Sequence, residues 1–119
     1  MSRTELTVTE IERTGVDAAA TLEAANADGE KFLNDGKTFL EVLNTNAATC
    51  TVTAVSTRTI DGLAVADLEV AVEQNERLFI GPFPRDTFNQ PSGADAGRVY
   101  VNFSAVTDVT IAAWRLATS

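Results

Sequence analysis

Acidic residues are the side chains of this sequence whose number and spacing come closest to supporting reaction chemistry. Glu69 and Glu73 share the parity of one strand face, and a pair of carboxylates can hydrolyse a glycosidic bond when both lie on a cleft floor. The same spacing is typical of a solvated strand face. With Asp108, they are the only acids that we consider as catalytic candidates, and we expect the chain not to be an enzyme.

The residue types that usually assist such carboxylates are missing or scarce. None of the 119 residues is histidine, which removes the commonest general base and the usual zinc ligand. Many aspartates lie in turn segments, where they cap their own backbone, and no D-x-D-x-D-G run supplies a calcium loop. Cys50 is the single cysteine and is expected to be a buried, unreactive thiol. We therefore expect no catalytic residue, no metal and no cofactor.

The charge balance restricts the partners. Seventeen acidic against nine basic residues give a formal net charge of −8, so we expect neither nucleic acid nor an anionic membrane as a partner. No apolar run approaches the length of a membrane span, and the beginning of the sequence lacks the apolar stretch of a signal peptide. The scarcity of lysine is compatible with a halophilic protein and equally with an ordinary acidic surface.

Apolar and aromatic residues outside the clearest strands are candidates for an interface. Aromatic side chains beside arginine are typical of interface cores, although the same residues could fill the domain's own core. Phe39 and Phe103 are expected in that core. The interface candidates are Leu6, Val8, Phe83, Phe88, Tyr100, Trp114 and Arg115.

The elements that must position these residues are short strands separated by turns. Residues 49–54, 68–73 and 99–104 alternate apolar and polar positions, which predicts strands buried on one face. Residues 39–43, 77–80 and 109–116 are apolar on both faces, as expected of central strands or of strands covered by a neighbouring subunit. Residues 109–116 could also change faces at a bulge. Turns are predicted at 34–36, 61–62 and 74–76.

The first part of the chain differs from the rest. Residues 5–11 alternate as in an extended arm or an edge strand, and residues 17–26 could form a short alanine-rich helix. The fold class that we predict is all-β: an antiparallel, jelly-roll-like β-sandwich with an extended N-terminal arm and at most one short helix. The arm and short helix occupy residues 1–28, and the sandwich occupies residues 29–119.

Three segments resemble a known group of proteins. Residues 29–44 (GEKFLNDGKTFLEVLN), residues 79–84 (FIGPFP) followed by Phe88-Asn89-Gln90, and the stretch from Val99 to Leu116 are similar to small β-rich structural proteins of tailed bacteriophages and related archaeal viruses. The resemblance implies a capsid decoration or cement protein, made in the host cytoplasm and located on the virion surface. Its implied partners are the major capsid protein and other copies of the chain, with a trimer favoured.

Two other interpretations stay open. One is a tail, connector or vertex protein of the same kind of particle. The other is a carbohydrate-binding sandwich that uses Trp114, Tyr100 and Phe88 as stacking platforms. If the protein decorates a capsid, residues 1–12 could be an attachment arm that adds a strand to a capsid edge.

Overall fold

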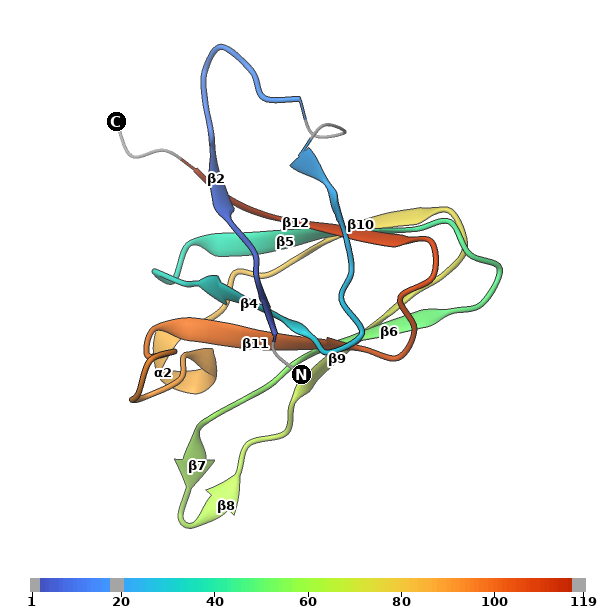
Figure 1. Ribbon diagram of the computed structural model, residues 1–119. Helices are drawn as coiled ribbons and strands as arrows, with labels where there is room; N and C mark the ends of the chain where they lie inside the picture. Colours follow the sequence, from blue (N-terminus) through green and yellow to red (C-terminus); the bar gives the residue numbers. More distant parts are fainter. Residues whose placement is uncertain (1–2, 18–20, 117–119) are drawn as a thin grey trace.

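Two β-sheets stacked face to face make up most of the computed structural model, which describes residues 3–17 and 21–116 (Figure 1). Sheet A contains, in spatial order, β1 (Thr4–Glu5), β4 (Glu30–Leu33), β11 (Arg98–Phe103), β6 (Cys50–Ala54) and β9 (Leu68–Val72). Sheet B contains β10 (Glu76–Ile80), β5 (Thr38–Asn44), β12 (Val109–Leu116) and β2 (Val8–Ile11), with β3 (Glu23–Ala24) also paired to β12. The prediction of an all-β fold is confirmed.

Two further elements lie outside these sheets. Strands β7 (Thr59–Ile60) and β8 (Leu63–Ala64) form a separate hairpin, and the short helix α2 (Arg85–Phe88) follows β10. None of the helices in the described ranges has the length and apolarity needed to cross a membrane.

The core lies between the two sheets and follows the alternation of the sequence. In sheet A, the inward positions of β6 are Cys50, Val52 and Ala54, and all three are buried. Leu40 and Val42 of β5 are buried on the facing side, in sheet B. A strand that is covered on one face buries every second residue and leaves the residues between them at least partly exposed.

Strand β12 (Val109–Leu116) has apolar residues of both parities, and the structure shows that it contains no bulge. Its pairing with β5 runs without interruption from Val109 opposite Asn44 to Arg115 opposite Thr38, so no bulge switches the faces. The odd-numbered residues up to Ala113 point into the core. Ala112, Trp114 and Leu116 have the opposite parity, which places them on the outer face of sheet B.

The N-terminal residues are edge strands of the sandwich. Strand β1 pairs in parallel with β4 of sheet A, and β2 pairs in parallel with β12 of sheet B. Leu6 lies between β1 and β2 and is buried in the core. Strand pairing satisfies the backbone groups that a detached arm would leave to solvent. Strands β1 and β2 are therefore members of the two sheets, in agreement with the edge-strand alternative that the sequence left open for residues 5–11.

The helix predicted over residues 17–26 is partly replaced by a strand. Residues 18–20 lie outside the described part of the chain, and Glu23–Ala24 form β3, which pairs with Thr110 and Ile111 of β12. A short alanine-rich segment is a marginal helix, so pairing with a sheet edge outweighs its propensity. The predicted turns are confirmed: Gly36, Asp61 and Asn75 all have positive φ.

Candidate functional site

An apolar groove runs across the outer face of sheet B. It encloses about 390 Å³. It is lined by Ile11, Val16, Phe39, Glu41, Phe79 and Trp114. Four of these side chains come from three adjacent strands because their register aligns them: Trp114 lies opposite Phe39, and Glu41 lies opposite Phe79. Ile11 comes from β2 and Val16 from the loop that follows β2, so the N-terminal strand contributes one wall.

The groove presents large apolar side chains to solvent. Phe79 is 65% exposed, and Leu116, farther along β12, is 62% exposed. The rings of Phe39 and Phe79 meet edge to face, with centroids 5.9 Å apart. Contiguous apolar surface of this kind on a folded domain marks an interaction site more often than scattered single residues do. We therefore take the groove as the candidate functional site.

Glu41 is the charged group at the floor of the groove, and both of its carboxylate oxygens have partners. The indole N–H of Trp114 donates to Oε1 at 2.9 Å, and Nε of Arg77 lies 3.1 Å from Oε2. Both Glu41 and Trp114 are buried. Each oxygen of this buried carboxylate therefore has a donor on a neighbouring strand, Trp114 on β12 and Arg77 on β10. Glu41 thus fixes the shape of the groove.

Three of the predicted interface residues belong to the core, which makes their assignment to an interface wrong. Leu6, Phe83 and Phe88 are all buried within the domain. The Phe83 ring packs against Phe32 and against Phe88, each with centroids 5.5 Å apart. The loop is held inward because Asn34 Nδ2 donates to the carbonyl oxygen of Phe83 at 2.8 Å.

The other four predicted interface residues lie in different places. Trp114 forms part of the groove floor, and Val8 is half-buried against the core. Arg115 joins two acids at the edge of sheet B: its Nε donates to Asp35 at 3.0 Å, and its Nη1 pairs with Glu10. The structure therefore brings Trp114 to the groove, whereas Val8 and Arg115 lie on the opposite face of sheet B and line a separate hollow with Asp35.

Tyr100 lies on the outer face of sheet A, away from the groove. The guanidinium of Arg3 lies 4.2 Å from the centre of the Tyr100 ring, and the Tyr100 hydroxyl donates a hydrogen bond to Asp95. This hydrogen bond raises the pKa of Tyr100 and lowers that of Asp95. One ring face of Tyr100 is thus occupied by arginine, while Phe88 and Trp114 are buried. The three proposed sugar platforms do not form one exposed surface.

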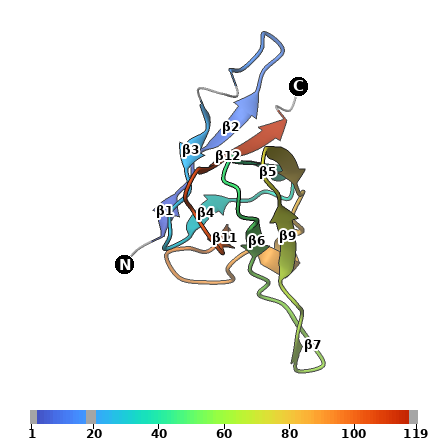
Figure 2. The same ribbon diagram turned by 90° about the vertical axis from the view of Figure 1, so that its right-hand side faces the viewer.

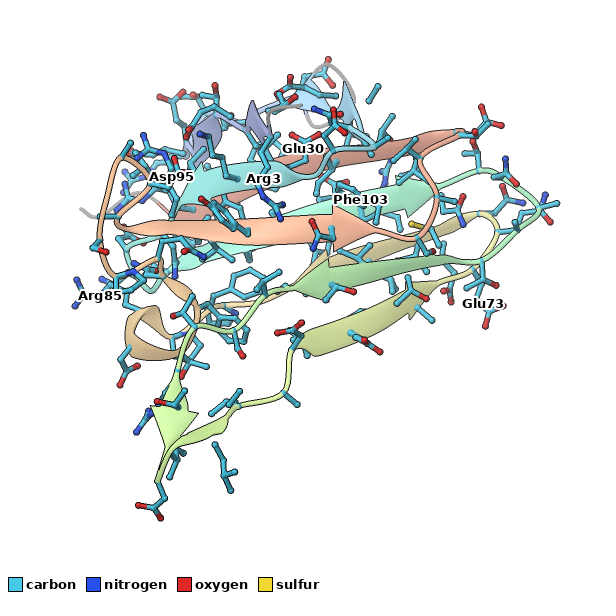
Figure 3. All side chains as sticks on the ribbon, turned by 60° about the horizontal axis from the view of Figure 1, so that its bottom comes forward. Arg3, Glu30, Glu73, Arg85, Asp95 and Phe103 are labelled. Carbon is cyan, nitrogen blue, oxygen red and sulfur yellow. The ribbon has the colours of Figure 1, made fainter. Side chains whose placement is uncertain are left out.

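A second buried carboxylate belongs to Glu30, the first residue of β4, whose backbone carbonyl oxygen accepts a hydrogen bond from Arg3. Glu30 points between the sheets and is almost fully buried, and its Oε2 accepts a hydrogen bond from the backbone N–H of Asn26 at 2.9 Å (Figure 3). Desolvation raises the pKa of Glu30 to about 7, and nearby Glu23 adds to the rise, while the Asn26 hydrogen bond opposes it. Glu30 therefore titrates near neutral pH.

The acids considered for catalysis are not gathered at one place. Glu69 is exposed on β9, Glu73 follows that strand, and Asp108 occupies a turn with positive φ. In residues 3–17 and 21–116, no group of three or more Cys, Asp or Glu side chains is arranged to hold a metal ion. Cys50 is buried, and its thiol lies 3.2 Å from the carbonyl oxygen of Ala105.

Sequence reasoning missed most of the groove. Phe39 was expected in the core, and Ile11, Val16 and Phe79 were not singled out. The signal was present in the two-sided apolar character of residues 39–43, 77–80 and 109–116, which indicates a second covered face. It does not say which parity faces outward. In comparisons with protein-family models, with curated proteins and with solved structures, no match to this chain was found.

Proposed function

We propose that this chain is a structural protein of a virion that decorates and stabilises a capsid by binding the major capsid protein, with the groove face of sheet B as a contact surface for neighbouring subunits of the particle. The groove itself is the observation that carries this proposal. Its side chains are apolar or aromatic, and its carboxylate already has both partners. Such a surface gains affinity by burying apolar area, which contributes about 25 cal/mol per Å². Attachment to another protein needs no more than this.

The order of the strands supports the jelly-roll interpretation of the fold. The eight strands β3, β4, β5, β6, β9, β10, β11 and β12 are arranged as β3-β12-β5-β10 in one sheet and β4-β11-β6-β9 in the other. If they are numbered one to eight, the two orders are 1-8-3-6 and 2-7-4-5, and successive strands mostly alternate between sheets. Jelly rolls of eight strands occur in viral capsid domains and in lectins, so the fold supports the proposal without deciding it.

The segments that resemble viral structural proteins also build the groove. Residues 29–44 contain β4 and β5, residues 79–84 begin at the end of β10, and the stretch from Val99 to Leu116 contains β11 and β12. Phe39, Phe79 and Trp114 therefore all lie within them. Four of the six residues that line the groove therefore lie in the segments that carry the resemblance.

Self-association forms part of the proposal, with a trimer as the favoured state. Copies that repeat one modest interface around a symmetry axis gain avidity on a shell that has the same symmetry. The site of action is then the outer surface of the virion.

The experiment is a binding assay with empty shells assembled from a major capsid protein of the same viral genome. The purified protein should sediment with the shells, and Phe79→Ser should reduce binding at least tenfold, because Phe79 is exposed and contributes apolar area. Leu68→Ser is the matched control, since Leu68 is an exposed apolar residue of sheet A. Failure of the wild-type chain to bind shells would contradict the proposal, and binding to purified tails instead would favour the tail or connector interpretation.

A further inference from the structure

The β7–β8 hairpin is a second apolar feature, separate from the groove. It projects from the body of the sandwich on the side of sheet A, away from sheet B (Figures 1 and 2). Asp61 and Gly62 form its turn, with φ of 54° and 80°. The side chains next to the turn are the aliphatic residues Ile60, which is 53% exposed, and Leu63, which is 73% exposed. The tip is therefore a convex apolar surface.

The base of the hairpin is fixed to the sandwich by several polar contacts. The backbone N–H of Thr57 donates to the carbonyl oxygen of Thr87 at 2.7 Å, and that of Ser56 donates to Asp67 Oδ1 at 2.9 Å. Arg58 pairs with Asp86 of α2 at 3.4 Å. A protruding element held in this way loses little conformational entropy when it binds. The hairpin is thus suited to present its tip to a partner.

We propose that the β7–β8 tip of one copy docks into the aromatic groove of the next copy, so that chains associate head to tail. The inference rests on the proposed function in one respect, namely that the groove is an interaction surface. Ile60 and Leu63 supply aliphatic side chains for a groove of about 390 Å³ that Phe39, Phe79 and Trp114 line. A convex and a concave apolar surface on one chain complement each other in shape and chemistry.

The charges around the two surfaces are complementary as well. Asp61 is exposed at the tip between the two aliphatic residues. Arg77, at the margin of the groove, is paired with Glu41 but leaves 46% of its side chain exposed. Arg13 is exposed in the loop between Ile11 and Val16, and it takes part in none of the ion pairs formed among the described residues. Arg77 on β10 and Arg13 after β2 thus place a guanidinium group beyond each edge strand of sheet B, and a docked Asp61 carboxylate would face one of them.

The placement of the two surfaces selects a second copy as the occupant. The hairpin and the groove lie on opposite sides of the sandwich, so a chain cannot fill its own groove (Figure 1). The net charge of −8 opposes nonspecific association between copies, which makes a contact that sets Asp61 against arginine the favourable one. Such a contact is heterologous. It closes into a ring of three copies if each is rotated by about 120°, and otherwise continues as a chain.

The experiment uses two variants that each remove one half of the contact, Leu63→Ser at the tip and Phe79→Ser in the groove. Both residues are exposed, so both variants should keep the wild-type melting temperature within a few degrees. In sedimentation velocity, the wild-type chain should form larger species as concentration rises, whereas each variant alone should weaken association at least tenfold. An equimolar mixture of the variants should recover a dimer, because one intact tip meets one intact groove, and this dimer should not grow further.

Three outcomes would overturn the inference: a wild-type chain that stays monomeric at all concentrations, a Leu63→Ser variant that associates like the wild type, or a mixture that stays monomeric although the wild type associates. Leu68→Ser serves again as the control for loss of an exposed leucine. Shell binding separates this inference from the proposed function. Loss of self-association in Leu63→Ser, with shell binding weakened but still present, would support both, whereas head-to-tail association without any shell binding would contradict only the proposed function.

Discussion

The indole N–H of Trp114 and the carboxylate of Glu41 form a buried hydrogen bond of 2.9 Å between adjacent strands of sheet B. The bond lies on the outer face of the sheet, where a side chain of β12 would otherwise be free to turn toward solvent. Arg77 holds the second oxygen of the same carboxylate from β10. The floor of the groove is therefore fixed across three strands by one carboxylate.

We expect Trp114→Phe to lower the free energy of unfolding by about 2 to 4 kcal/mol. The change removes a hydrogen bond to a buried charge, which contributes roughly 1.5 to 3 kcal/mol, as well as part of a large apolar side chain. Urea denaturation would measure the loss. Phe79→Leu is the control, since Phe79 is mostly exposed and should change stability by less than about 1 kcal/mol. Equal losses in the two variants would show that the Glu41 hydrogen bond contributes nothing.

The raised pKa of Glu30 predicts a pH-dependent stability with a definite sign. The folded state holds the proton up to about pH 7, whereas the unfolded chain releases it near the ordinary glutamate pKa of 4.5. The folded state thus binds more protons between these values, and the free energy of unfolding should fall as pH rises from about 4.5 to 7 and then level off. Because one pKa unit corresponds to about 1.4 kcal/mol, we expect a fall on the order of 3 kcal/mol.

Glu30→Gln tests the assignment of this pH dependence. Glutamine can still accept the hydrogen bond from the Asn26 backbone N–H but has no charge to desolvate. The variant should be more stable than the wild type at pH 8 and equally stable near pH 4, as measured by urea denaturation at each pH. If the variant kept the whole fall between pH 4.5 and 7, another group would have to cause it.

A comparison of Gly29 with Gly15 isolates the effect of close packing on the stability of the fold. Both have positive φ, 94° and 101°, so alanine is strained at either position. A Cβ at Gly29 would clash with the Arg3 guanidinium and would lie 2.8 Å from Asn102 Oδ1, whereas a Cβ at Gly15 meets nothing within 4 Å. We expect Gly29→Ala to lower the melting temperature clearly more than Gly15→Ala. Equal shifts would mean that Arg3 moves aside without cost.

Salt should stabilise the domain through its acidic surface. Screening weakens the self-repulsion of a chain with net charge −8, and most of this effect is complete by about 0.5 M salt, where the Debye length is a few ångströms. We therefore expect the melting temperature to rise by a few degrees up to that concentration and then to level off. A rise that continued into the molar range would favour the halophilic interpretation, and calorimetry across a salt series would distinguish the two.

The sandwich could be predicted from the sequence because the alternation of apolar and polar residues in its clearest strands indicates which residues are buried. Residues 50–54 alternate between buried and half-buried positions in the structure as they alternate in the sequence. The order of the strands in the two sheets leaves no such local trace, because it depends on which segments pair across long distances. The parallel pairing of β2 with β12 could not be predicted from the local sequence either. An alternation of apolar and polar residues fits an extended arm as well as an edge strand.

The interface residues could not be predicted for a related reason. Phe83 follows a proline in a glycine-containing loop, and such a loop can expose an aromatic ring or fold it inward. The hydrogen bond from Asn34 to the carbonyl oxygen of Phe83 holds the ring in the inward position. It joins residues 49 positions apart, so the local sequence does not reveal it. For Phe79, the sequence shows an apolar residue in a two-sided strand. Its exposure follows from the position of β10 at the edge of sheet B.

The pairing of β2 with β12 has a consequence for biosynthesis. Val8 to Ile11 pair with Ala113 to Leu116, so β2 is translated more than a hundred residues before the strand with which it pairs. Sheet B cannot be completed before Leu116 has left the ribosome, and until then its apolar strands remain open to chaperones or to neighbouring nascent chains.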